Sequence, residues 1–327
     1  MAASGALPSN LTLYDLTVLQ RNDRYTGLIE DVTTLPREWD TIPAVPREGW
    51  WYEIVKRVQY PTAQFRQVNG GVSASRSIYK KEVKQMLFID TQLVIDEAIW
   101  DADDASVGSV WMLEAKGALE AASILIGQQT YYGTSADANG FVGLRSQFAG
   151  VVKAGGTTST TSAYLVWADE KEGIRYDVGK NGSFQISAPF RQQVSNPSGG
   201  SGNIFAYVGN LKGYVGLFIG SNLTAWGITG ITSTITSPGT NGITDAQAQQ
   251  LVGQIPIKRR NKMTWYMNRT ANAVLQQNRN AVTAATGIAQ YQPSDTGGRP
   301  AYAPIPDYLA GYKIEVTDSI LNTETNS

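Results

Sequence analysis

The sequence contains no cysteine and no histidine among its 327 residues. Without cysteine there is no disulfide framework, no thiolate nucleophile and no Cys-ligated zinc. Without histidine the commonest general base near neutral pH is missing, together with Ser-His-Asp triads and imidazole-bound metals. Any catalysis would therefore rest on carboxylates, lysine, tyrosine or serine.

An excess of charge of either sign is also missing, because 27 Lys and Arg stand against 28 Asp and Glu, for a net charge of -1. This balance provides no overall field that attracts nucleic acid, which argues against sequence-specific DNA binding. The chain has no uninterrupted apolar run of about 18 residues, and residues 1–8 lack a basic region followed by an apolar one. We expect a chain that is soluble and cytosolic when made and has no membrane partner.

One acidic segment is a candidate metal site. Asp101, Asp103 and Asp104 resemble the start of a calcium-binding loop. However, the sixth position holds Ser106 where glycine is needed, and the twelfth holds Met112 where glutamate is needed. Acidic residues before a helix are better explained as caps, so the sequence predicts no metal site.

Two glycine-rich segments and two carboxylate groupings complete this search. Residues 155–157 and 198–202 are not followed by Lys-Ser or Lys-Thr, so flexible loops explain them better than phosphate cradles. Glu114 and Glu120 are six residues apart and do not share a helix face, and the cluster at 169–172 shows no acid-base pair. We predict no catalytic residue, no cofactor site and no enzymatic activity.

One dense basic run stands out, formed by Lys258, Arg259, Arg260 and Lys262. It is a candidate contact for phosphate or for an acidic partner surface. The alternative is a solvated loop that joins a helix to a strand beginning at Met263. We favour the loop, because four cations without interleaved aromatic residues do not define a nucleic-acid site.

The first hundred residues predict an arm followed by a long β-hairpin. Residues 1–48 contain a short amphipathic candidate helix at 11–20 and several prolines, with too little apolar surface to fold alone. Residues 49–97 alternate as a strand, turn at 69–71 and return. A two-stranded hairpin is marginal in water unless it packs on something. We therefore list its aromatic and basic side chains as candidate contacts between subunits: Trp50, Trp51, Arg57, Arg66, Arg76, Lys80 and Lys81.

The rest of the chain predicts a mixed α+β protein. Apolar and small residues recur at helical spacing over 107–131, a helix that would be roughly 35 Å long. After Gly133 the pattern changes to short apolar runs separated by glycine, serine and threonine. These runs predict strands at 163–168, 204–208, 213–219, 263–267 and 312–316, and helices at 246–252 and 270–277.

The order of these parts resembles the major coat protein of tailed bacteriophages, whose fold is named after phage HK97. Four strings resemble the podovirus-type branch of that family: LTLYDL at 11–16, LVWADEKEGI at 165–174, MTWYMNRT at 263–270 and VTDSILNTE at 316–324. The resemblance covers nearly the whole chain in the family's order. It implies an N-arm (1–48), an E-loop hairpin (49–97), a peripheral domain (98–150 and 203–242, with a spine helix at about 107–131) and an axial domain (151–202 and 243–327).

The resemblance also implies a function and partners. We expect a major capsid protein that self-assembles as pentamers and hexamers into the icosahedral head, made in the host cytoplasm and ending in the virion. A separate scaffolding protein, a portal protein, a decoration or cement protein and non-specifically packaged double-stranded DNA would be its partners. Two alternatives stay open: an encapsulin-like compartment shell protein, and a glycan-binding β-rich surface protein.

Overall fold

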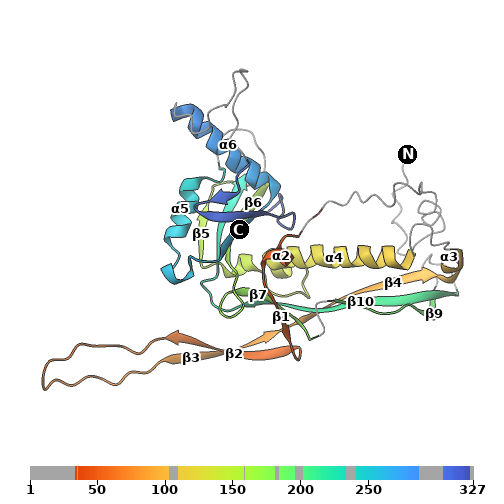
Figure 1. The fold of residues 1–327 in the computed structure, drawn as a ribbon, viewed down its shortest axis with the longest axis horizontal. Helices are drawn as coiled ribbons and strands as arrows, with labels where there is room; N and C mark the ends of the chain where they lie inside the picture. Colours follow the sequence, from red (N-terminus) through yellow and green to blue (C-terminus); the bar gives the residue numbers. More distant parts are fainter. Residues whose placement is uncertain are drawn as a thin grey trace.

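The computed structural model describes residues 34, 36–102, 110–157, 159–180, 184–195, 202–232, 241–286 and 305–324 (Figure 1). The predicted helix at 11–20, Asp103, Asp104, Ser106 and all but the last residue of the glycine-rich segment at 198–202 lie outside these residues. Of the described helices, none combines the length and apolar character required to cross a bilayer.

The first sheet has six strands built around one long strand, β10 (Asn203–Ile219). Along one side β10 pairs antiparallel with β4 (Leu87–Asp96), and along the other it pairs in succession with three strands. These three strands are β7 (Ile174–Gly179), β8 (Phe184–Ile186) and β9 (Phe190–Ser195). The short β1 (Ala44–Arg47) extends the sheet as a parallel neighbour of β7.

The long helix α4 (Val110–Tyr132) lies along this sheet, next to β4 and β10 (Figure 1). Its buried side chains recur every three or four residues and include Trp111, Ala115, Ala118, Ala122 and Ile126. The small residues allow close approach to the sheet, where α3 (Glu97–Ala102) completes a common core. The predicted helix at 107–131 is confirmed over its described part, from residue 110 onwards.

The second sheet has the order β13-β14-β12-β6-β11-β5. Its strands are β5 (Gly150–Lys153), β6 (Thr160–Trp167), β11 (Ala225–Thr232), β12 (Met263–Met267), β13 (Tyr308–Leu309) and β14 (Tyr312–Val316). Helices α5 (Asp245–Gly253) and α6 (Arg269–Thr286) supply Leu251, Ala271 and Leu275 to the core of this sheet. Thr244 and Gln247 form a reciprocal capping box that starts α5.

A buried tyrosine cluster joins the two sheets to α4. Tyr131 of α4 and Tyr164 of β6 have ring centroids 4.6 Å apart, and Tyr176 of β7 and Tyr266 of β12 belong to the same core. Thr130 and Tyr176 share a hydrogen bond of 2.7 Å between their hydroxyl groups. This cluster makes one continuous core beneath the C-terminal half of α4.

The structure corrects several boundaries. The predicted return strand from 77 to 96 is two strands, because Met86 separates the basic β3 (Ile78–Gln85) from the apolar β4. The predicted strands at 204–208 and 213–219 are one strand, β10, since pairing with β4 continues through Asn210. Helix α6 extends beyond residue 277, to Thr286.

The sheets also regroup the chain relative to the predicted domains. Strands β7, β8 and β9 come from the segment expected in the axial domain, but they pair with β10 in the first sheet. Strand β11 comes from the segment expected in the peripheral domain, but it pairs with β6 in the second sheet. The physical reason is that hydrogen bonding of strand edges follows spatial neighbours, which local apolar patterns do not encode.

Candidate assembly interface

Strands β2 (Trp51–Gln59) and β3 form an antiparallel hairpin that is a separate two-stranded sheet. The hairpin projects from the body, and its distal end extends well beyond both larger sheets (Figure 1). At the far end Asn69 adopts a positive φ of 67°, and the Gly70 amide donates a 3.0 Å hydrogen bond to the Gln67 carbonyl. The predicted turn at 69–71 is therefore where the chain reverses.

The two faces of β2 differ in exposure, as its alternating sequence predicts. Tyr52, Ile54 and Lys56 are half-buried on one face, whereas Glu53, Val55 and Arg57 are exposed on the other. All seven predicted contact residues lie in or next to this hairpin and are exposed. Exposed large apolar side chains accompany them: Val55, Val58, Tyr60, Phe65, Val68, Val72, Ile78, Tyr79 and Val83. Many exposed large apolar side chains on one projecting segment are typical of an interaction surface.

The hairpin is strongly basic. Residues 50–86 contain seven Lys and Arg against two Glu, for a net charge of +5. Glu82 lies among three lysines, with its carboxylate 2.8 Å from Lys56 Nζ and 3.5 Å from Lys80 Nζ and Lys84 Nζ. The hydrogen bond from Lys56 lowers the pKa of Glu82 to about 2. The two glutamates leave most of the positive charge for a partner surface.

A buried charge cluster anchors the root of the hairpin to β7. Asp177 is 2% exposed and accepts a hydrogen bond from the Tyr52 hydroxyl. Its Oδ1 lies 2.9 Å from Arg175 Nε and 3.4 Å from Arg47 Nε. Burial raises the pKa of Asp177 to about 6, an effect that Arg47 partly opposes. The Arg175 guanidinium stacks 3.6 Å from the ring centroid of Phe218, which fixes the cluster against β10.

Close backbone packing supports the same root. The Met86 amide donates a 2.8 Å hydrogen bond to the Trp50 carbonyl, which closes the base of the hairpin. A Cβ atom on Gly216 of β10 would lie 2.9 Å from the Gln85 carbonyl oxygen, so only glycine fits there. The sequence search missed Asp177 and Arg175; alternating charges inside the otherwise apolar β7 were the available signal.

The basic run at 258–262 lies elsewhere, between α5 and β12. Lys262 Nζ donates a 3.1 Å hydrogen bond to Asp169, and Lys258 Nζ lies 3.9 Å from Glu172. Arg259 donates to the Leu223 carbonyl, and Arg260 donates to the Ile255 carbonyl at 3.2 Å. These cations therefore contact an acidic loop and backbone carbonyls of their own chain. The described residues contain no cluster of three or more acidic side chains able to hold a metal ion.

Comparison with known proteins gives the family. Residues 52–327 match the model of the family "Major capsid protein GP7", so the chain belongs to this family. No curated protein matches the chain.

One solved structure shows the same fold, and two others are more distantly similar. The capsid structure of bacteriophage Epsilon15 matches with a TM-score of 0.67 at 18% identity, over 99% of each chain. The capsid of bacteriophage JBD30 matches with a TM-score of 0.48 at 10% identity, over 94% of this chain and 99% of that one. The SrpI encapsulin of Synechococcus elongatus PCC 7942 matches with a TM-score of 0.47 at 9% identity, over 67% of this chain and 96% of that one.

The predicted fold class and function are confirmed. The chain has the HK97-like capsid fold and is a tailed-phage major capsid protein that self-assembles into the head shell, which makes it a component of the virion. The family places it with phage head shell proteins rather than with encapsulins or glycan-binding proteins.

Proposed function

We propose that the β2–β3 hairpin is the E-loop through which each subunit grips a neighbouring copy in the shell. The observation that carries this proposal is the hairpin's surface, which exposes a run of large apolar side chains and a net charge of +5 with no third strand beside it among the described residues. Burial of apolar surface would supply affinity, while the excess cations would select an acidic partner surface.

The two sheets are proposed to have separate roles in the shell. The first sheet with α3 and α4 would form the peripheral domain, and the second sheet with α5 and α6 the axial domain around the five-fold and six-fold rings. Residues 1–48 would be the N-arm. This revises the predicted division only where β7, β8, β9 and β11 pair across it.

The remaining partners follow from the resemblance to tailed-phage heads. We propose assembly in the host cytoplasm with a separate scaffolding protein and a portal protein, a decoration or cement protein on the finished shell, and non-specific contact with packaged double-stranded DNA. The chain would act without catalysis. The basic run at 258–262 is proposed to brace the acidic loop at 169–172, which is supported by the contacts of Lys258 and Lys262.

A hairpin deletion tests the gripping role. Replacing residues 61–77 by a two-residue turn should leave a folded chain, because both larger sheets and their cores lie outside this segment. Electron microscopy of the variant expressed with its scaffold should show few or no closed shells. Normal, stable shells from the shortened chain would contradict the role.

Two double substitutions distinguish a specific contact of the hairpin from a general effect of surface hydrophobicity on assembly. Phe65→Ser with Val68→Ser removes exposed apolar side chains at the far end of the hairpin. Ile257→Ser with Ile305→Ser removes exposed apolar side chains from the body and serves as the matched control. Shell yield should fall with the first pair and stay unchanged with the second. Equal yields would argue against a specific hairpin contact.

A further inference from the structure

The one-turn helix α2 (Glu38–Thr41) lies where α4 meets both sheets. The Trp39 ring stacks on Tyr176 of β7, with ring centroids 4.8 Å apart. The Thr41 hydroxyl shares a 2.6 Å hydrogen bond with the hydroxyl of Tyr266 of β12. Because a single helical turn has little stability of its own, these side-chain contacts hold α2 against the core.

Glu38 is the buried polar group of this contact. It is fully buried, and its Oε2 accepts a 3.2 Å hydrogen bond from the hydroxyl of Ser319 in the C-terminal segment at 317–324. Its Oε1 has no hydrogen-bond partner among the described residues. An ionised carboxylate needs donors at both oxygens to replace its lost hydration, so this site suits a neutral carboxyl group.

The groups that face Glu38 from the neighbouring elements are hydroxyl groups without charge. They come from α4, β7, β12 and the C-terminal segment: Tyr131, Tyr176, Tyr266, Thr317 and Ser319. Burial raises the pKa of Glu38 above its ordinary value of 4.5, and hydrogen bonding by the Thr317 hydroxyl opposes this only in part.

The charged side chains of the surrounding elements are paired with one another. On α2, β14 and the C-terminal segment these pairs are Arg37 with Asp40, Lys313 with Glu315, and Arg269 of α6 with Asp318. Among the described residues no Lys or Arg forms an ion pair with Glu38. A negative charge on Glu38 would therefore be buried without compensation.

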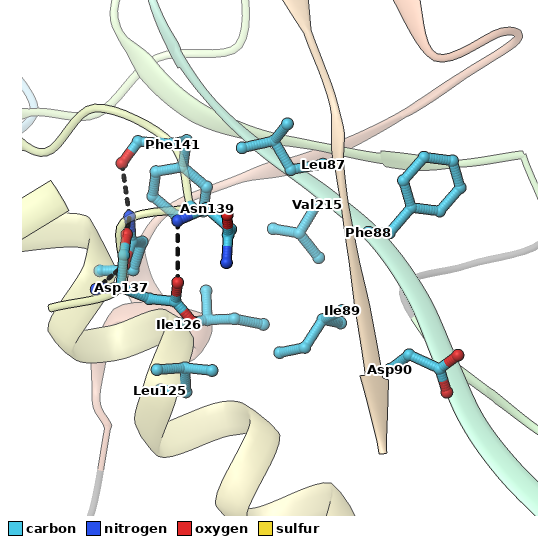
Figure 2. Close-up of a pocket in the computed structure, with 12 residues that line it drawn as sticks. Leu87, Phe88, Ile89, Asp90, Leu125, Ile126, Asp137, Asn139, Phe141 and Val215 are labelled. Carbon is cyan, nitrogen blue, oxygen red and sulfur yellow. Dashed lines mark hydrogen bonds between the residues drawn. The ribbon is translucent and has the colours of Figure 1, made fainter. Parts of the chain in front are cut away.

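The region around Glu38 is closely packed. A Cβ atom on Gly127 of α4 would clash with Ser319 Oγ, so the helix and the C-terminal segment touch beside Glu38. A cavity of about 240 Å³ adjoins a different face of α4, where Leu125 and Ile126 line it (Figure 2). Neither Glu38 nor a group that faces it lines this cavity. Water in the cavity therefore cannot hydrate an ionised Glu38.

We propose that α2 is a protonation-dependent plug, which stays in the core while the Glu38 carboxyl carries its proton and leaves when this group ionises. Release lets water hydrate the carboxylate and leaves the strand pairing of both large sheets intact. Since α2 follows residues 1–37, the plug would decide whether the proposed N-arm starts from a fixed or a free root. The inference goes beyond the gripping role of the hairpin and does not rest on it.

The direction of the pH effect follows from burial. In the released state Glu38 regains its ordinary pKa of 4.5, whereas in the plugged state its pKa is higher. The plugged state is thus fully favoured below the ordinary pKa and becomes less favoured as pH rises toward the raised one. Between these two pKa values the ratio of released to plugged subunits should grow about tenfold for each pH unit.

Hydrogen exchange of the unassembled subunit between pH 5 and pH 8 tests the plug. The Ile42 amide reports on α2, because it donates a 2.9 Å hydrogen bond to the Glu38 carbonyl. After correction for the intrinsic effect of pH on exchange, protection of this amide should fall as pH rises, while amides in α5 keep their protection. In Glu38→Gln the protection of Ile42 should be the same at both pH values.

The matched control is Glu324→Gln, which replaces a second buried carboxyl whose pKa is raised by burial. Its partners are Tyr132 and Arg145, so this variant should keep the pH dependence of the Ile42 amide. Three results would each overturn the proposal: constant protection of Ile42 in the unmodified chain, an equal fall in Glu38→Gln, or a parallel fall in α5. The last result would show that the whole subunit opens.

Thiol labelling gives a second measurement, because the chain contains no native cysteine. Ile42→Cys places a thiol next to α2, and Ala248→Cys places one in α5; both native side chains are buried. The ratio of the first labelling rate to the second should rise by about tenfold or more from pH 5 to pH 8. Adding Glu38→Gln should abolish this rise. A rise that persists with Glu38→Gln, or a ratio that stays constant without it, would contradict the plug.

Discussion

Two buried carboxyl groups stand out among individual residues. Glu38 on α2 (Glu38–Thr41) is fully buried and accepts a 3.2 Å hydrogen bond from the Ser319 hydroxyl. Glu324 is also buried and accepts a 2.5 Å hydrogen bond from the Tyr132 hydroxyl. Burial raises the pKa of both groups. Each hydrogen bond joins the last described segment to an earlier helix, α2 or α4, so both carboxyl groups help to hold the C-terminal segment in place.

Glu38→Gln tests the sign of this effect. A raised pKa in the folded state means that the carboxyl contributes stability below its ordinary pKa, near 4.5, and that this contribution is lost as pH rises through the raised value. Glutamine keeps the shape without the charge, so it should raise the free energy of unfolding at pH 8. Urea denaturation of the unassembled subunit at pH 5 and pH 8 measures this. The control Glu48→Gln replaces an exposed carboxylate and should change the free energy of unfolding at neither pH. A drop in stability at pH 8 for Glu38→Gln would refute the raised pKa of Glu38.

Tyr52→Phe tests the buried anchor of the hairpin. The change removes the hydrogen bond to Asp177 and should cost about 1–3 kcal/mol, with the larger loss above pH 6, where the carboxyl is ionised. Hydrogen exchange should show faster exchange in β2 and no change in α5. Tyr79→Phe, on the exposed side of the hairpin, is the control. Unchanged exchange in β2 would show that the anchor lies elsewhere.

At the scale of elements, the spacing of apolar and polar residues predicted where individual helices and strands form and which of their faces are buried. The alternation of Tyr52, Glu53 and Ile54 predicted the faces of β2, and the spacing of Trp111, Ala115 and Ala118 predicted α4. These patterns could not predict which strands pair with each other, because β7 and β11 are apolar strands that fit either sheet. The anchor at Asp177 was missed for a similar reason: two of its partners, Arg47 of β1 and Tyr52 of β2, are far away in sequence.

A substitution in β10 tests how closely α4 packs against this strand. A Cβ atom on Gly209 would lie 2.4 Å from the Trp111 ring, so Gly209→Ala should force α4 away from the sheet and cost about 1–3 kcal/mol. Gly117→Ala is the matched control, since nothing lies within 4 Å of that position on α4. The control should stabilise the subunit by about 0.5–1 kcal/mol through higher helix propensity. Thermal unfolding measures both; equal melting temperatures would contradict the packing argument.

At the scale of the whole molecule, the chain divides its apolar surface between two uses. The cores of the two sheets are filled by its own side chains, whereas the apolar side chains of the hairpin find no cover within the subunit. A subunit of this kind is incomplete alone and is completed by copies of itself. The structure thus links a local feature, the exposed apolar hairpin, to the formation of a closed shell.

Electron cryomicroscopy of the assembled shell tests this claim most directly. The account predicts that the hairpin of every subunit lies on an adjacent copy, which covers its exposed apolar side chains. A shell in which the hairpins fold back onto their own subunits, or extend into solvent with Phe65 uncovered, would contradict it.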